Sequence, residues 1–265
     1  MDNLISSKDN SNIKHVKKLI SSSKFRAETK SFVIEGVRMS EEALKNKSKI
    51  LKAFYTQKCA EKNPKLIAEI ENNAKQTFLV SENLIKAISD AKTPQGMVLV
   101  CEQKSQNEMI KDLGANIILL ENIQNPSNLG SIFRVCDALG VKDIFILGDS
   151  CDIYNPKVLR GSMGSIFRLN LFLEENSLGC IKNLRSLGYK IYATVPKDDA
   201  THLDKTEFLG KCGIIFGNEG NGIKEETIKA CDCNITIPMN KETESLNVSV
   251  AAGIVIWEMI KRGNK

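Results

Sequence analysis

Three loops of this 265-residue chain combine polar side chains with glycines in a way that could hold a ligand and stabilise charge on it. The first, NIQNPSNLGSIFRVCDALG, contains Asn128, Gly130 and Arg134. Gly130 permits a close backbone approach, and Arg134 follows one helical turn later on the same face. A helix is expected over residues 131–139, so Arg134 would lie in its N-terminal half, where the macrodipole disfavours a cation. This position indicates an anionic partner for Arg134; the alternative is a capped helix with a surface arginine.

The second loop, FGNEGNGI, places Gly217, Gly220 and Gly222 directly after the apolar strand CGIIF. The glycine order GxxGxG differs from the GxGxxG fingerprint of dinucleotide-binding sites, and Glu219 would repel a pyrophosphate. These features count against a nucleotide-cofactor oxidoreductase on an ordinary doubly wound sheet. A loop that presents a carboxylate and carbonyls suits a cationic or hydrogen-bond-donating ligand, and the alternative is an ordinary glycine-rich turn.

The third loop lies in IPMNKETESLNVSVAAGIVIWEM, between an apolar strand and an apolar helix. Ser245 or Asn247 could cap the helix, and a cap needs only one of them. The other polar side chains therefore have spare hydrogen-bonding capacity. The small residues Ala251, Ala252 and Gly253 follow, and they allow a ligand to approach the backbone.

The elements around these loops indicate two α/β domains. Residues 1–102 alternate short strands with helices, residues 103–115 are polar and are expected to be a linker, and residues 116–265 form a second α/β domain. In the second domain, continuous apolar strands alternate with helices, which predicts a mostly parallel sheet covered on both faces. Ligands of such sheets bind beyond the carboxyl ends of the strands, where all three loops lie.

A basic cluster near the N-terminus predicts a nucleic-acid surface. Seven basic residues and two acidic residues, Asp9 and Glu28, lie between positions 8 and 30. Such clusters contact phosphates, although charge alone is equally consistent with a solvated helix face. Over the whole chain 37 basic residues face 32 acidic residues, a mild excess.

The cysteines and histidines do not form a recognisable metal-binding pattern. Eight cysteines are scattered without a CxxC pair, Cys231 and Cys233 are too close for ordinary zinc spacing, and His15 and His202 lack neighbouring ligands. No metal is therefore expected. The opening residues MDNLISSKDN lack the apolar core of a signal peptide, so a reducing cytoplasm is the expected location.

The three loops together resemble the motifs of the SpoU/TrmH family, in the SPOUT superfamily of S-adenosylmethionine-dependent RNA ribose 2′-O-methyltransferases. The matching patterns are NxGxxxR (Asn128, Gly130, Arg134), FGxExxG (Phe216, Gly217, Glu219, Gly222) and IPM…SLNVSVAxxI (Ile237 to Ile254). They occur in the family's order and span the chain from about Asn116 to the end. The stretch RAETKSFVIEGVRMSEEAL, with Arg26, Phe32, Glu35 and Gly36, is similar to the ribosomal-protein-like RNA substrate-binding domain that precedes many members.

This resemblance implies a homodimer whose C-terminal domain is threaded as a deep trefoil knot. It implies S-adenosylmethionine as cofactor, held by Thr194, Val195, Gly217, Ile237, Met239 and Leu246. It implies a catalytic group of Asn128, Arg134, Glu219, Ser245 and Asn247, in which Asn128 orients Arg134 or the ribose and Glu219 anchors Arg134 or the RNA. The RNA-binding residues would be Lys14, Lys17, Lys18 and Arg26. By family analogy 23S rRNA is the favoured substrate; tRNA, or RNA binding without catalysis, is the alternative.

Overall fold

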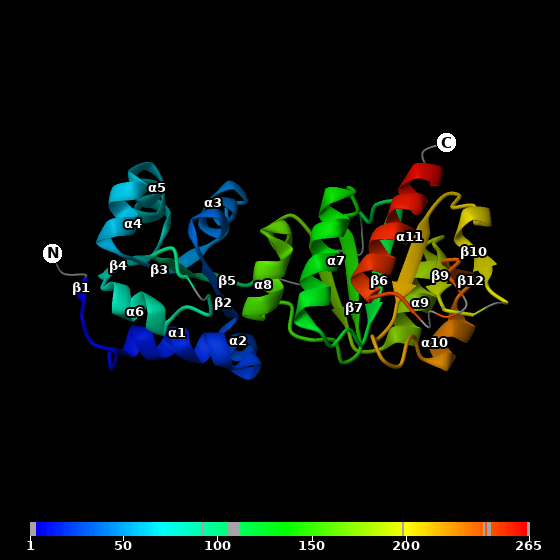
Figure 1. The fold of residues 1–265 in the computed structure, drawn as a ribbon, viewed down its shortest axis with the longest axis horizontal. Coiled ribbons are helices and arrows are strands. Elements are labelled where there is room, and N and C mark those ends of the chain that lie inside the picture. Colours follow the sequence, from blue (N-terminus) through cyan, green and yellow to red (C-terminus); the bar gives the residue numbers. More distant parts are fainter. Residues whose placement is uncertain are drawn as a thin grey trace. The chain divides into compact units, whose positions relative to one another are not determined.

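The computed structural model describes residues 4–91, 93–104, 112–197, 199–240, 242 and 245–263. They form two compact units (Figure 1). One contains the described residues up to Lys104 together with Tyr154–Phe167, and the other contains the remaining described residues. Most of the stretch predicted as a linker, residues 105–111, lies outside the described residues. The domain boundaries drawn from the sequence therefore stay a prediction.

The N-terminal unit is built on a five-stranded mixed sheet in the order β1-β4-β3-β5-β2. β3 pairs parallel with β4 and antiparallel with β5, and β5 pairs antiparallel with β2. The strands are β1 (Leu4–Ile5), β2 (Ser31–Glu35), β3 (Ile50–Tyr55), β4 (Gln76–Val80) and β5 (Met97–Glu102). The helices up to Lys104 are α1 (Ser11–Ser21), α2 (Ser23–Thr29), α3 (Val37–Lys45), α4 (Gln57–Lys62), α5 (Pro64–Asn73) and α6 (Glu82–Ala87).

Helix α1 covers this sheet with a single apolar face. Ile13, Val16 and Leu19 recur at helical spacing and are fully buried against residues of the sheet such as Val33 and Phe54. The helix ends at Ser21, and the Ser22 hydroxyl accepts from the Phe25 amide to cap α2. The predicted alternation of short strands and helices over this part of the chain is confirmed.

Residues 154–167 belong to this unit although they come from the middle of the chain. They form α8 (Pro156–Ser162) and the short 3-10 helix η1 (Ser165–Phe167). Arg160 of α8 makes ion pairs with Glu35 (3.2 Å) and Asp90 (2.6 Å). The ring of Tyr154 packs 4.5 Å from that of Phe32. Sequence periodicity gave no sign of this association.

The C-terminal unit contains a seven-stranded sheet in the order β10-β12-β9-β11-β6-β7-β8, and every pairing in it is parallel. This confirms the predicted parallel α/β architecture. The strands are β6 (Asn116–Glu121), β7 (Asp143–Leu147), β8 (Asn170–Glu174), β9 (Lys190–Thr194), β10 (Thr201–His202), β11 (Cys212–Phe216) and β12 (Cys233–Thr236). The helices are α7 (Pro126–Ala138), α9 (Ser177–Ser186), α10 (Glu225–Ala230), α11 (Val248–Gly263) and the 3-10 helix η2 (Leu203–Lys205).

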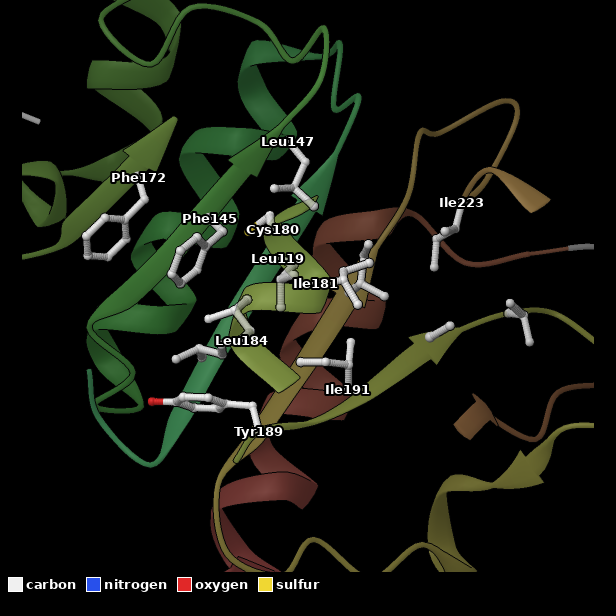
Figure 2. Packing of buried hydrophobic residues seen from close by; sticks show 14 of the residues in the cluster. Leu119, Phe145, Leu147, Phe172, Cys180, Ile181, Leu184, Tyr189, Ile191 and Ile223 are labelled. Atoms are coloured by element: carbon white, nitrogen blue, oxygen red, sulfur yellow. The ribbon is translucent and has the colours of Figure 1, made fainter. Parts of the chain in front are cut away.

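Both faces of this sheet are covered, as continuous apolar strands require. On one face Leu119 and Phe145 pack against Ile181 and Leu184 of α9 (Figure 2). On the opposite face α7 and α11 pack against each other, and in Figure 2 α11 lies behind the sheet. Within the described residues no helix is long and apolar enough to cross a membrane.

One expectation about this unit was wrong, and its edge strands were missed. Helix α7 begins at Pro126 rather than at residue 131, because the Asn125 side chain caps it and Pro126 occupies its first position. The edge strands β8 and β10 were not predicted; in β8 only Phe172 is buried, so its burial does not alternate along the strand.

Candidate functional site

A pocket of about 530 Å³ lies in the C-terminal unit, beyond the carboxyl ends of β9, β11 and β12. These strands are neighbours in the sheet, so the segments that follow them converge at one edge. All six residues predicted to hold a cofactor line this pocket: Thr194, Val195, Gly217, Ile237, Met239 and Leu246. Glu219, Ser245 and Asn247 of the predicted catalytic group line it as well.

The loop after β11 forms one wall, and its path leaves no room for a side chain at Gly217. A Cβ at this position would lie 2.5 Å from the Gly222 carbonyl oxygen and closer still to the Gly222 carbonyl carbon and the Ile223 nitrogen. Backbone hydrogen bonds between Asn218 and Gly222 in both directions hold the chain in this path. The left-handed φ of +68° at Gly222 also favours glycine.

Asn218 and Glu121 hold the two ends of this loop. The Asn218 side chain donates to the Asn122 carbonyl (2.8 Å) and accepts from the Gly220 and Asn221 amides. At the far end, the buried Glu121 carboxylate accepts from the Lys224 amide and the Thr227 hydroxyl. Sequence reasoning missed both residues. An asparagine that follows a glycine at the end of a strand is a typical turn residue and could have indicated Asn218.

Glu219 connects the pocket to the start of α7. Its carboxylate accepts from the Gln124 amide (3.3 Å), the Asn125 amide (3.1 Å) and the Asn128 side chain (3.0 Å). The Asn128 oxygen accepts in turn from the Asn247 amide group (3.1 Å). The structure therefore brings Asn128 of α7, Glu219 and Asn247, which are far apart in the sequence, into one hydrogen-bonded chain.

The charge of Glu219 determines which groups donate and which accept in this series of hydrogen bonds. Burial disfavours the carboxylate, but the hydrogen bonds from Asn128 and from backbone amides outweigh it and hold the pKa of Glu219 below its usual value. An ionised carboxylate can only accept, so the Asn128 amide must turn its NH₂ group toward Glu219 and its oxygen toward Asn247. Each amide group thus has one defined orientation.

Asn247 also begins the last helix. Its side-chain oxygen accepts from the Ser249 amide (3.0 Å) and hydroxyl (2.6 Å), and its carbonyl accepts from the Val250 and Ala251 amides. The predicted alternative, Ser245, lines the pocket instead. In the polar run before it, Lys241, Thr243 and Glu244 lie outside the described residues.

Arg134 lies on α7 but not in the wall of the pocket. Because α7 begins at Pro126, Arg134 is beyond the middle of the helix, and the expected conflict with the helix dipole does not exist. Its side chain is exposed and makes no hydrogen bond or ion pair with any residue that the structure describes. Glu219 contacts Asn128 rather than Arg134.

The basic cluster of the N-terminal unit is smaller than its sequence indicates. Lys14, Lys17 and Lys18 are exposed on α1, with Lys14 paired to Asp9 and Lys18 placed over the Phe25 ring. Arg26 is only 3% exposed and donates to the Leu19 and Ile20 carbonyls at the end of α1. This burial indicates a structural role for Arg26 and does not favour its predicted contact with RNA.

The pocket fits a nucleoside-sized cofactor. Its volume is in the range of small-molecule sites, and its walls combine apolar side chains such as Val195 and Leu246 with backbone of the glycine loop. The carboxylate of Glu219 lies at its edge and is compatible with a cationic group. The residues predicted to hold a cofactor and the polar residues thus meet in one pocket, whereas Arg134 does not line it.

Comparison with known proteins identifies relatives along the whole chain. Residues 115–257 match the SpoU rRNA Methylase family, and residues 10–99 match an MRM3-like substrate binding domain. The chain is 30% identical over 256 residues to a 23S rRNA (guanosine(2553)-2′-O)-methyltransferase, RlmP, of Bacillus subtilis, covering 96% of this chain and 98% of that one. An AdoMet-bound rRNA methyltransferase from Sinorhizobium meliloti superposes with a TM-score of 0.88 at 25% identity, covering 97% of both chains.

Proposed function

The chain belongs to the SpoU rRNA methylase family, and on that premise we propose that it transfers a methyl group from S-adenosylmethionine to a ribose 2′-hydroxyl of ribosomal RNA. One observation carries the assignment to this chain's own residues. The six cofactor residues expected from the motifs line one pocket together with Glu219, Ser245 and Asn247. A non-catalytic RNA-binding protein would have no need for such a pocket.

Gly217, Ile237 and Leu246 would hold the cofactor, with Thr194, Val195 and Met239 completing the wall. S-adenosylmethionine, when bound, supplies an electrophilic methyl group on a sulfonium centre. The absence of a side chain at Gly217 lets the backbone come close to the ligand. The carboxylate of Glu219 favours a positive charge near the edge of the pocket.

Asn128 and Asn247 would position the ribose. Their amide groups are fixed in direction by Glu219 and lie where three loops meet. Such preorganised dipoles stabilise developing charge without reorganising during the reaction. Ser245 extends the same polar wall.

Arg134 would stabilise negative charge on the attacking oxygen and hold an adjacent phosphate. A guanidinium group is a hydrogen-bond donor with no acceptor site, so Arg134 would not act as the base, and phosphate or water would take the proton of the hydroxyl. Its side chain is exposed and has no partner among the described residues, which leaves it available for an RNA phosphate. This role is supported by the family motif and no longer by the helix dipole.

The substrate would be 23S rRNA rather than tRNA, as for the Bacillus subtilis relative. The N-terminal unit would bind it, with Lys14, Lys17 and Lys18 on its surface and Arg26 in a structural role. Eight free cysteines are consistent with a reducing cytoplasm.

We propose a homodimer that associates through α11. Val250, Ile254 and Trp257 recur at helical spacing on this helix and are exposed, Trp257 by 55%. Three large apolar side chains exposed along one face of a helix are unusual on the surface of a monomer. The family's deep trefoil knot is proposed for the same part of the chain, with the loops around Ile237 and Leu246 in it.

The test uses the chemistry of the product. A ribose 2′-O-methyl group blocks alkaline cleavage of the next phosphodiester, so a labelled methyl group should appear in alkali-stable dinucleotides. Purified protein is incubated with methyl-labelled S-adenosylmethionine and unmodified transcripts of 23S rRNA or tRNA. Label in dinucleotides of 23S rRNA supports the proposal. Label in mononucleotides would indicate base methylation and refute it. Calorimetry with S-adenosylmethionine and NAD separates the methyltransferase from the oxidoreductase alternative.

A further inference from the structure

A second pocket, of about 170 Å³, lies within the N-terminal unit where β2 and β3 begin and β5 ends. Lys47, Lys49 and Lys104 line it, together with one acid, Glu102. The buried rings of Phe32 and Tyr154 also line it. The site is separate from the lysines of α1. The substrate-binding match covers Phe32, Lys47 and Lys49, but neither the motifs nor the comparisons assign this pocket a ligand.

The charge of this pocket is positive even after its internal pairing. Lys49 makes an ion pair with Glu102 (2.6 Å). The Lys104 ammonium donates to the Phe167 carbonyl (2.6 Å), which fixes its position but does not neutralise it. Lys47 makes no ion pair within the part of the chain that the structure describes. Three cations thus face a single carboxylate in a hollow that is partly lined by aromatic side chains.

The backbone at Lys47 is in an unusual conformation for a lysine. Its φ is +52°, in the left-handed region. Its amide donates to the Leu44 carbonyl as α3 ends, at a position where glycine is common. A helix C-terminus favours a cation, but Lys45 already lies in the last turn. The dipole therefore does not explain why a lysine rather than a glycine stands at position 47. Backbone strain of this kind often accompanies function.

We infer that this pocket binds a phosphodiester of the RNA substrate through Lys47, Lys49 and Lys104. The inference rests on the proposed function, because it takes RNA as the ligand. Charge complementarity supports it: a phosphate would replace Glu102 as the partner of Lys49 and would provide Lys47 with an anion. Low-dielectric surroundings, such as buried rings, strengthen this attraction.

The test measures affinity for an unmodified 23S rRNA transcript by filter binding between 50 and 200 mM KCl, with the full-length chain. Lys47→Gly removes the charge and relieves the left-handed strain, so it should weaken binding several-fold while the thermal midpoint stays equal or rises. Weaker binding with undiminished stability excludes misfolding as the cause. Adding Lys49→Ala should reduce the slope of log K against log salt by about 0.7–0.9, the loss of one phosphate contact.

Two further variants act as controls. Glu102→Gln removes the competing carboxylate and should tighten binding. Lys58→Ala removes one exposed charge from α4, beyond the opposite end of β3, and should leave affinity unchanged. The inference would be overturned if Lys47→Gly/Lys49→Ala kept the wild-type RNA affinity and salt slope. It would also be overturned if Lys58→Ala lost as much RNA affinity as the double variant. The proposed function is tested separately, by wild-type methyl transfer to the same transcript.

Discussion

Replacing Gly217 with alanine should weaken cofactor binding more than any other single-methyl change in the glycine loop. The new Cβ would lie 2.5 Å from the Gly222 carbonyl oxygen, whereas ordinary contacts begin near 3.4 Å. The obstacle is backbone rather than a flexible side chain, so the loop itself must move by about 1 Å. Overpacking of this kind typically costs about 1–3 kcal/mol, and a loop that must return to its original path to bind the cofactor raises Kd by the corresponding factor, roughly 5- to 150-fold.

Gly220→Ala is the matched control. It makes the same chemical change three residues later in the same loop, and the nearest atom to its Cβ would be the Asn218 side-chain oxygen at 3.6 Å. Isothermal titration calorimetry with S-adenosylmethionine should show near wild-type affinity for Gly220→Ala and a large loss for Gly217→Ala. Circular dichroism checks that both variants are folded. Equal affinities of the two variants would refute the steric reasoning, and so would wild-type affinity of Gly217→Ala.

Three other predictions concern the polar network, Arg134 and the dimer. Arg134→Ala should lower the single-turnover rate of methyl transfer ~10²- to 10³-fold, about 3–4 kcal/mol, and leave the affinity for S-adenosylmethionine unchanged. Arg134→Lys should restore only part of the lost rate. A rapid-quench rate of Arg134→Ala within threefold of wild type would remove Arg134 from the mechanism. Glu219 has a lowered pKa, so its stabilising contribution is present above the unfolded-state pKa near 4.5 and is lost as pH falls through the folded-state pKa. The difference in urea-unfolding free energy between wild type and Glu219→Gln should therefore be constant near neutral pH and shrink below about pH 4.5; a difference that persists unchanged in acid would contradict this. Light scattering at micromolar concentration should show a dimer that Trp257→Lys shifts toward monomer; a monomeric wild type would refute the dimer.

The sequence predicted the parallel sheet and the loops at its carboxyl edge for a simple physical reason, whereas the individual cofactor residues came from the resemblance to the SpoU/TrmH family. Each apolar strand is followed by a polar loop, so the sequence shows which residues lie at the carboxyl edge of the sheet. The loops after β11 and β12 meet there because these two strands are near neighbours in the sheet. The sequence could not show which side chains of these segments are hydrogen-bonded to each other. The contact of Glu219 with Asn128, 91 residues away, depends on the order of strands in the sheet.

The errors also have local causes. Asn125-Pro126 was interpreted as loop, although asparagine before proline is a typical helix start, and the argument from the dipole at Arg134 failed with it. Counting charges between positions 8 and 30 could not reveal that Arg26 is directed inward. The association of residues 154–167 with the N-terminal unit depends on contacts such as Arg160 with Asp90, which leave no periodic signal.

The central claim is that this pocket carries out ribose 2′-O-methylation of 23S rRNA, and mapping of 2′-O-methyl groups in cells tests it most directly. Ribosomal RNA from cells that lack the protein is compared with RNA from cells that regain the wild type, Gly217→Ala or Arg134→Ala. The account predicts that one 2′-O-methylated nucleotide of 23S rRNA disappears, returns with the wild type and returns poorly with either variant. An unchanged set of 2′-O-methyl groups in 23S rRNA without the protein would contradict it.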